Sequence, residues 1–153
     1  MKNGKRAKKA KIVIRFAKDW SDREVIGLYK AGGWWDDLVD EAAIVGNIIS
    51  GSFVFAVAVD VESGKAVGMG RVLSDGASDA YIQDVVVLPG YRRRGVGKML
   101  ILALRDFCLS KKIGWIALVA ESGTEKFYSD LGFRVMPGHT PMKYMGDREG
   151  SRK

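Results

Sequence analysis

The residues with the clearest chemical potential form a basic turn that contains two glycines, Arg92-Arg93-Arg94-Gly95-Val96-Gly97-Lys98. The glycines would let backbone N–H groups approach a ligand closely. If a helix begins there, the positive end of its dipole lies at the same place. Such an arrangement, with cationic side chains around it, is suited to phosphate or pyrophosphate. The same composition also fits a plain strand-to-helix turn with a solvated basic rim.

Two common nucleotide-binding motifs do not fit this turn. A Walker A loop needs glycine five residues before its Gly-Lys pair and serine or threonine after it. In this chain Arg92 and Met99 stand at those positions. A Rossmann fingerprint needs a third glycine, and the chain has Leu100 there. The remaining pattern is R-x-x-G-x-G.

The segments on either side place the turn between a strand and a helix. An almost unbroken apolar run at the end of Ala80–Leu88 predicts a buried strand, and the apolar spacing of Arg94–Ser110 predicts a helix. A further strand over Ile113–Ala120 would complete a βαβ unit. The other patterns predict strands at Ile12–Ala17, Phe53–Asp60, Lys65–Leu73, Phe133–Met136 and Met142–Met145, and helices at Ser21–Gly32, Asp36–Ile49 and Gly123–Leu131.

The predicted elements follow the order β-α-α-β-β-β-α-β-α-β-β. This order favours a single-domain α+β fold with a mixed, mostly antiparallel central sheet flanked by helices. The length of 153 residues suits one compact domain. We expect a basic, disordered arm at residues 1–11, the folded domain at 12–146 and a flexible tail at 147–153.

The formal net charge of +7 comes from the two ends of the chain, because the body from Ile12 to Gly146 is formally neutral. The basic arm could be a solubilising extension or could contact nucleic acid or an anionic surface. No apolar run reaches the ~18 residues that cross a bilayer, so no membrane partner is expected. A single cysteine, Cys108, excludes an intramolecular disulfide. We expect a cytoplasmic protein.

A second block, Phe127-Tyr128-Ser129-Asp130-Leu131-Gly132-Phe133, lies one predicted helix and one predicted strand beyond the turn. The turn, preceded by Val87-Leu88-Pro89, matches the Q/R-x-x-G-x-G/A loop of the Gcn5-related N-acetyltransferase (GNAT) superfamily. The second block matches the F-Y-x-x-L-G-F signature of the same superfamily. The chain therefore resembles that superfamily, in detail over residues 80–135 and in element order over residues 12–145.

The resemblance implies an N-acetyltransferase that uses acetyl-CoA as co-substrate and no metal. The acceptor would be a primary amine of a small molecule or peptide, which attacks the thioester directly within a ternary complex. A backbone N–H near Val86 would steady the oxyanion. Where the family frequently has an asparagine that contacts coenzyme A, this chain has Glu121. The residues implied to bind the coenzyme are Val85, Val86, Val87, Arg92, Arg93, Arg94, Gly95, Val96, Gly97, Lys98 and Phe127.

The resemblance also implies that Tyr128 is the general acid that protonates the departing thiolate. A phenol with a pKa near ~10 is a filled donor at neutral pH. The family's usual base positions are held here by Tyr81 and Gln83, and neither is a good base. Asp84 could be the base if a β-bulge turned it to their face, or it could be a buried structural group. We expect deprotonation through ordered water, with these three side chains as the polar lining.

Trp34 and Trp35 fall where the family's acceptor pocket is walled. One of them would line the pocket, unless they only pack in the core and on the surface. The position of Cys108 predicts a core residue, and His139 is interpreted as a loop residue. One cysteine and one histidine cannot supply the usual ligands of a scaffold zinc site.

A different class of function is also open. The chain could be a non-catalytic acyl-CoA-binding or regulatory module whose basic arm contacts nucleic acid or a protein. Tyr128 favours the enzyme, and the lack of an obvious base favours the binding module. For the enzyme, a homodimer is left open and nucleic acid is not expected as a partner.

Overall fold

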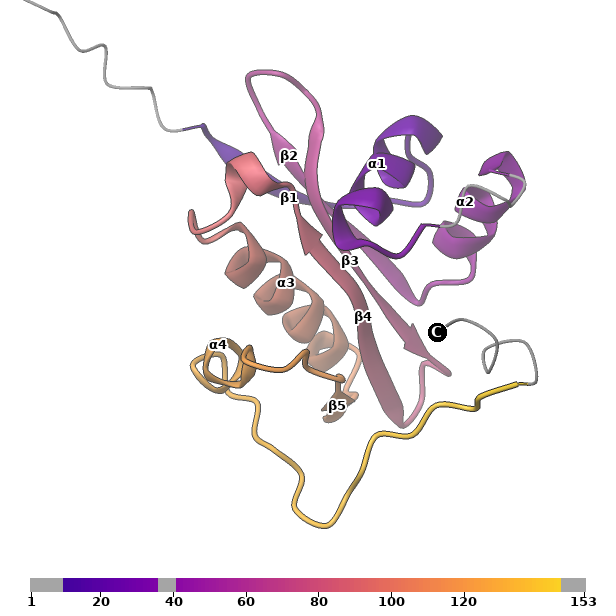
Figure 1. The fold of residues 1–153 in the computed structure, drawn as a ribbon, viewed down its shortest axis with the longest axis vertical. Helices are drawn as coiled ribbons and strands as arrows, with labels where there is room; N and C mark the ends of the chain where they lie inside the picture. The colour runs from indigo at the N-terminus through magenta and orange to yellow at the C-terminus, as the bar shows by residue number, and fades with distance from the viewer. Residues whose placement is uncertain (1–9, 36–40, 147–153) are drawn as a thin grey trace, which may run out of the picture. The chain divides into compact units, whose positions relative to one another are not determined.

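The computed structural model describes residues 10–35 and 41–146 of the chain (Figure 1). Residues 1–9 of the predicted arm, residues 36–40 at the start of the predicted second helix and the predicted tail at 147–153 lie outside the described residues. The chain divides between Leu118 and Val119 into two compact units, and each is described by itself. The predicted boundaries at residues 11 and 147 stay predictions.

The first unit is built on a five-stranded sheet with the strand order β1-β2-β3-β4-β5. Strands β1 to β4 pair antiparallel, and β4 pairs with β5 in parallel. The predicted α+β fold and the mixed, mostly antiparallel sheet are thereby confirmed. The elements of this unit are β1 (Ile12–Phe16), α1 (Asp22–Gly32), α2 (Glu41–Ser50), β2 (Val54–Asp60), β3 (Ala66–Ser74), β4 (Asp79–Val87), the 3₁₀ helix η1 (Pro89–Tyr91), α3 (Val96–Ser110) and β5 (Trp115–Ala117).

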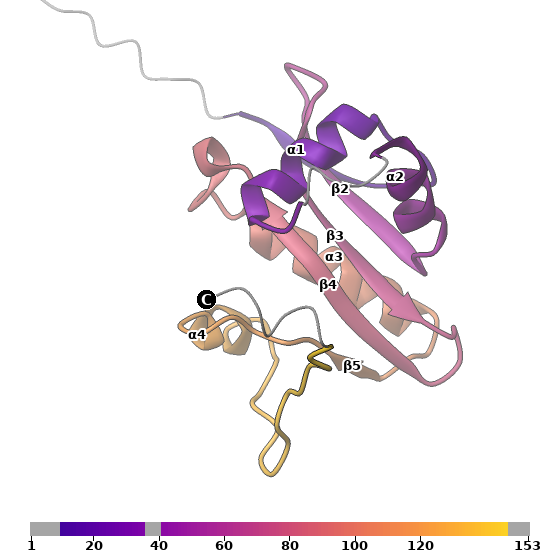
Figure 2. The same ribbon diagram turned by 45° about the vertical axis from the view of Figure 1, so that its right-hand side comes forward.

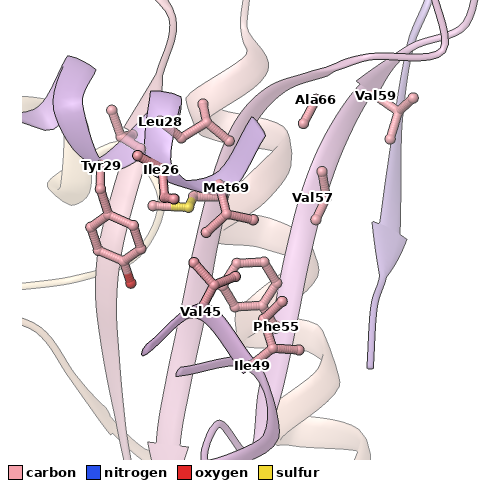
Figure 3. Close-up of a cluster of buried hydrophobic side chains, with 12 residues drawn as sticks. Ile26, Leu28, Tyr29, Val45, Ile49, Phe55, Val57, Val59, Ala66 and Met69 are labelled. Atoms are coloured by element: carbon pink, nitrogen blue, oxygen red, sulfur yellow. The ribbon is translucent and has the colours of Figure 1, made fainter. Parts of the chain in front are cut away.

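The two faces of the sheet are covered by different helices (Figures 1 and 2). On β3, Met69 belongs to a buried cluster with side chains of α1 and α2 (Figure 3). Its neighbour Gly70 points the other way, because a Cβ there would lie 3.0 Å from Leu104 of α3. Successive residues of a strand face opposite sides. Helices α1 and α2 therefore cover one face of the sheet, and α3 covers the other.

The C-terminal end of α1 brings three aromatic side chains to the sheet. The helix stops at Gly33, whose φ of 76° is the left-handed conformation that glycine adopts at helix ends. The chain then turns so that the Trp34 ring covers Gly32, where a Cβ would lie only 2.6 Å from the ring. The rings of Trp34 and Trp35 lie 6.4 and 5.9 Å from that of Tyr29. A larger residue at position 32 would therefore force the Trp34 ring to move.

The second unit contains the helix α4 (Glu125–Ser129). The predicted strands at Phe133–Met136 and Met142–Met145 are not formed in the described part of this unit. A strand needs a partner for its backbone groups, and the prolines of this segment have no N–H to donate. Gly132 and Gly138, with φ of 94° and 77°, also turn the chain. Apolar residues at strand-like spacing were not sufficient here to form the last two strands.

Candidate functional site

The turn between β4 and α3 presents backbone N–H groups at a helix start. Arg93 has φ 58° and Gly95 has φ 83°, so two left-handed residues alternate with ordinary ones. Gly95 is the N-cap of α3 and no side chain caps it. The first N–H groups of a helix have no partner within it, and α3 is 15 residues long. The turn predicted from sequence thus has the backbone geometry of an anion site.

Open space lies in front of this turn. A Cβ built on Gly95 would meet no atom within 4 Å. The side chains of Arg93, Arg94 and Lys98 are exposed. A large anion with several oxygens fits this combination of N–H donors, open space and cations, so the residues present suit the pyrophosphate of coenzyme A.

The arginines of the turn do not all point to solvent. Arg92 donates from Nε to the Val87 carbonyl at 2.9 Å and from Nη2 to the Ala31 carbonyl at 3.5 Å. The Arg94 guanidinium lies 5.5 Å from the centre of the Tyr91 ring, a distance at which a cation is attracted by the ring face. Arg92 therefore ties the turn to β4 and α1, and Arg94 is placed by Tyr91.

A tyrosine–aspartate pair anchors the turn to the far end of β2. The Tyr91 hydroxyl donates to Oδ2 of Asp60 at 2.7 Å, and Asp60 also accepts from the Glu62 N–H at 3.0 Å. The hydrogen bond from Tyr91 is the main reason that the pKa of Asp60 is lowered, and the same bond raises the pKa of Tyr91. Asp60 is 6% exposed. This pair was not predicted from the sequence, although an acid at the end of an apolar strand is a signal for it.

Strand β4 contains a β-bulge at Asp84, the residue for which the sequence left open which face of the sheet it occupies. Met69 of β3 pairs with Val86, and Arg71 pairs with Gln83, so the single residue Gly70 lies opposite both Asp84 and Val85. Asp84 has φ 54°, a left-handed conformation that is uncommon for a residue with a side chain. The bulge breaks the alternation of faces.

The bulge places Asp84 on the α1 side of the sheet. Its Oδ2 accepts a hydrogen bond from Tyr29 of α1 at 2.7 Å and from Arg71 Nε at 2.5 Å (Tyr29 is drawn in Figure 3). Paired residues share a face, so Gln83 lies on this side as well. Burial, and next the hydrogen bond to Asp84, raise the pKa of Tyr29. The Asp84 carboxylate thus lies on the same face of the sheet as Gln83, which was the condition for it to be the base. It is, however, paired with Arg71.

One edge of β4 is left without a partner strand beyond its first residues. The parallel ladder joins Asp79, Ala80 and Tyr81 to β5 and stops there. The strand predicted over Ile113–Ala120 is therefore reduced to three residues. Among the described strands, none pairs with the edge of β4 from Ile82 to Val87. An extended chain could add to that edge through backbone hydrogen bonds.

Aromatic side chains lie on the same face of the sheet. The rings of Tyr81 and Trp115 are 5.3 Å apart, and both are exposed. Trp34 is 44% exposed, whereas Trp35 packs against the core. The buried Nε1 of Trp35 has no hydrogen-bond partner among the described residues. A buried donor without a partner is costly.

Tyr128, the predicted acid, lies in α4 of the second unit. Its ring is in edge contact with Phe127 at 5.0 Å and Phe133 at 6.1 Å. Burial raises the pKa of Tyr128, and the negative charge of Glu121 raises it further. The phenol therefore keeps its proton at neutral pH. Its role stays a prediction.

Cys108 and His139 do not contact the other candidate site residues described above. Cys108 is buried in α3, which confirms the predicted core position, and burial raises its pKa. His139 is exposed, and its Nδ1 lies 3.0 Å from the Pro137 carbonyl oxygen. Within residues 10–35 and 41–146, no group of three or more His, Cys, Asp or Glu could hold a metal ion. No helix in the same ranges is long and apolar enough to cross a membrane.

Known proteins are similar in sequence to the part of the chain that contains the turn and α4. A family model described as an acetyltransferase (GNAT) domain matches residues 50–135. The histone acetyltransferase TAP1 of Glycine max is 45% identical over 76 residues, which is 50% of this chain and 33% of that protein. The chloroplastic GCN5-related N-acetyltransferase 2 of Arabidopsis thaliana is 44% identical over 73 residues, 48% of this chain and 28% of that protein. The match thus spans about a third of the length of these relatives.

Solved structures extend the similarity to most of the chain. A GNAT-family acetyltransferase from Streptococcus pneumoniae superposes with a TM-score of 0.72 at 26% identity, covering 90% of this chain and 99% of that one. Glucosamine-6-phosphate N-acetyltransferase from Arabidopsis thaliana gives a TM-score of 0.71 at 20% identity, covering 89% and 99%. The second likeness concerns the fold alone.

Proposed function

Because this chain belongs to the GNAT acetyltransferase family, we propose that it transfers an acetyl group from acetyl-CoA to a primary amine. The observation that carries the proposal is the start of α3. There the left-handed residues Arg93 and Gly95 shape the turn, open space lies at Gly95, and the side chains of Arg93, Arg94 and Lys98 are exposed. The amides from Arg93 to Lys98 would hold the coenzyme pyrophosphate.

The free edge of β4 supports a second part of the binding site. The backbone of Val85, Val86 and Val87 would pair with the pantetheine arm as an added strand does. The ladder to β5 ends at Tyr81 and Ala117, which leaves this edge unpaired by the described strands. Binding at two places, the turn and the edge, would fix the thioester relative to the sheet.

The proposed reaction is direct transfer within a ternary complex. The amine nitrogen forms a bond to the thioester carbon, the carbon–sulfur bond breaks, and the thiolate takes a proton from Tyr128. A backbone N–H near Val86 steadies the oxyanion. The proton lost by the amine passes to ordered water, and the Tyr128 phenolate takes a proton back from solvent before the next turnover. The raised pKa of Tyr128 is consistent with this role, because the phenol is fully protonated before transfer.

The acceptor would bind on the α1 side of the sheet. Tyr81 and Gln83 lie on this face, and Trp34 and Trp35 border it through their contacts with Tyr29. One relative is named a histone acetyltransferase, and another, from Trypanosoma brucei brucei, is named a glucosamine 6-phosphate N-acetyltransferase. Protein lysines and amino sugars therefore belong among the first amines tested. The cytoplasmic location and a homodimer stay predictions.

Calorimetric titration with acetyl-CoA followed by a thiol-release assay tests this function. The full chain should bind acetyl-CoA with one site and release coenzyme A thiol with at least one class of primary amine. The amine panel should include lysine peptides, polyamines, arylalkylamines, aminoglycosides, amino acids and glucosamine 6-phosphate. Binding without turnover on any amine would favour the non-catalytic acyl-CoA-binding module. No binding would remove both functions.

A further inference from the structure

The bulge in β4 is held from both faces of the sheet. On the α1 side, Arg71 and Tyr29 both donate to Oδ2 of Asp84, at 2.5 and 2.7 Å. On the α3 side, Gly70 leaves room for the extra residue, because a Cβ there would lie 3.2 Å from a methyl group of Val85 and 3.7 Å from its Cα. The position of the bulged backbone is therefore determined by contacts with two neighbouring elements.

The conformation of Asp84 requires such support. Its φ of 54° is uncommon for a residue with a Cβ, although aspartate and asparagine adopt it more often than other side chains, and glycine adopts it without cost. A strained residue of this kind persists where its surroundings over-determine it. The two hydrogen bonds to Oδ2 come from β3 and from α1, so they oppose a return of Asp84 to ordinary strand geometry.

The same contacts distinguish Asp84 from a free general base. Both hydrogen bonds end on one carboxylate oxygen, and the charge is balanced by Arg71. The side chains of Arg71 and Asp84 are only 17% and 22% exposed. The arrangement favours a carboxylate that stays paired during turnover.

We propose that Asp84 is a positioning residue: with Arg71 and Tyr29, it holds the bulge so that the backbone of Val85–Val87 meets the thioester arm of acetyl-CoA. The inference rests on the proposed function, in which that backbone binds the pantetheine and steadies the oxyanion. Of the two roles considered for Asp84, general base and structural group, the inference assigns the structural one. Ordered water would then accept the proton of the amine.

Three variants and one matched control test this role by acetyl-CoA affinity and turnover. Tyr29→Phe removes one donor to the carboxylate, and we expect acetyl-CoA affinity to fall about tenfold, as for one lost hydrogen bond to a charged group. Arg71→Lys keeps the charge without the Nε donor and should lie between wild type and Tyr29→Phe. Asp84→Asn keeps an oxygen acceptor, so the pH profile of its kcat/KM should keep its shape. Asp79→Asn, an exposed position on the same strand, should match wild type.

Amide hydrogen exchange gives a readout that does not depend on acetyl-CoA. The amides of residues 85–87 should exchange about tenfold faster in Tyr29→Phe, and those of β1 and β2 should not change. Because phenylalanine fills the same space as tyrosine, this variant is expected to fold. The Asp79→Asn control should leave exchange at residues 85–87 as in wild type.

The outcomes separate the inference from the proposed function. Suppose that Asp84→Asn lowers kcat by about 10²–10⁴-fold, leaves acetyl-CoA affinity unchanged and removes one limb of the pH profile of kcat/KM. That result would make Asp84 the base and would overturn the proposal. Unchanged exchange at residues 85–87 in Tyr29→Phe would also overturn it. If wild type binds no acetyl-CoA but exchange at the bulge rises in Tyr29→Phe, the proposed function fails while the holding role of Asp84 stands.

Discussion

The Tyr91 hydroxyl donates a 2.7 Å hydrogen bond to Oδ2 of Asp60, which joins the turn before α3 to the end of β2. The two residues are 31 positions apart in the chain. Arg94 lies over the ring of the same tyrosine. The turn that carries the candidate anion site is therefore fixed to a strand that lies two places away from β4 in the sheet.

Tyr91→Phe should weaken acetyl-CoA binding and leave the chemical step intact. Loss of the bond to Asp60 frees the turn, so we expect KM for acetyl-CoA to rise about three- to tenfold at unchanged kcat. Steady-state kinetics at saturating amine measures both constants. A fall of kcat with unchanged KM would contradict a role in placing the turn.

The same variant should change the pH dependence of stability. The pKa of Asp60 is lowered chiefly by the Tyr91 hydrogen bond, so its contribution to stability is present above the ordinary aspartate pKa of about 3.9 and is lost as pH falls through the lower folded value. Tyr91→Phe should therefore lose less stability on acidification below about pH 4 than wild type. Urea unfolding at several pH values measures this. In an Asp60→Asn background, the effect of Tyr91→Phe should not depend on pH.

Gly95→Val should abolish acetyl-CoA binding in a folded protein. Its φ of 83° is strained for any side chain, and a β-branched residue would fill the open space in front of the amides. We expect affinity to fall by about a hundredfold or more, measured by calorimetry, with the circular dichroism spectrum unchanged. Gly90→Ala is the matched control, since a Cβ there also meets nothing within 4 Å and φ is not positive. Wild-type affinity in Gly95→Val would show that the turn binds no coenzyme.

Tyr128→Phe should lower kcat and leave acetyl-CoA affinity nearly unchanged. A general acid contributes about 10²–10⁴-fold, and we expect the lower end because a thiol is already a tolerable leaving group. Rapid-quench or thiol-release kinetics measures kcat, and calorimetry measures affinity. Phe133→Leu changes a ring neighbour of Tyr128 without touching the phenol, and it should retain more activity. Turnover like wild type in Tyr128→Phe would remove the acid assignment.

Glu121→Gln should lower the pKa of Tyr128 part of the way toward its ordinary value. Burial is the larger cause of the raised pKa, and the charge of Glu121 is the smaller one. Because the acid must carry its proton, the alkaline limb of the kcat profile should move to lower pH in this variant. Ultraviolet titration of the phenols measures the pKa, with Tyr128→Phe as the reference that identifies the Tyr128 signal. An unmoved titration would show that Glu121 does not act on Tyr128.

Local patterns were sufficient for most of the first unit. The apolar run before Pro89 and the glycines at 95 and 97 predicted a strand, a turn and a helix, and all three are present. These features depend on neighbours in the chain: the backbone freedom of glycine, the alternation of a strand and the spacing of a helix. The predicted strands after Gly132 were not formed, because pairing depends on a partner strand that local spacing does not encode.

By itself, the sequence determined the family resemblance, the α+β order of the first unit and the place of the basic turn. Only the tertiary structure decided what Asp84 and Tyr91 contact. Asp84 meets Tyr29 from 55 positions away, and the face it occupies depends on one extra residue in β4 opposite Gly70. A strand pattern predicts alternation, whereas a bulge is set by the register between two strands and by the side chains that fill the space around it. That register arises only when β3, β4 and α1 pack together.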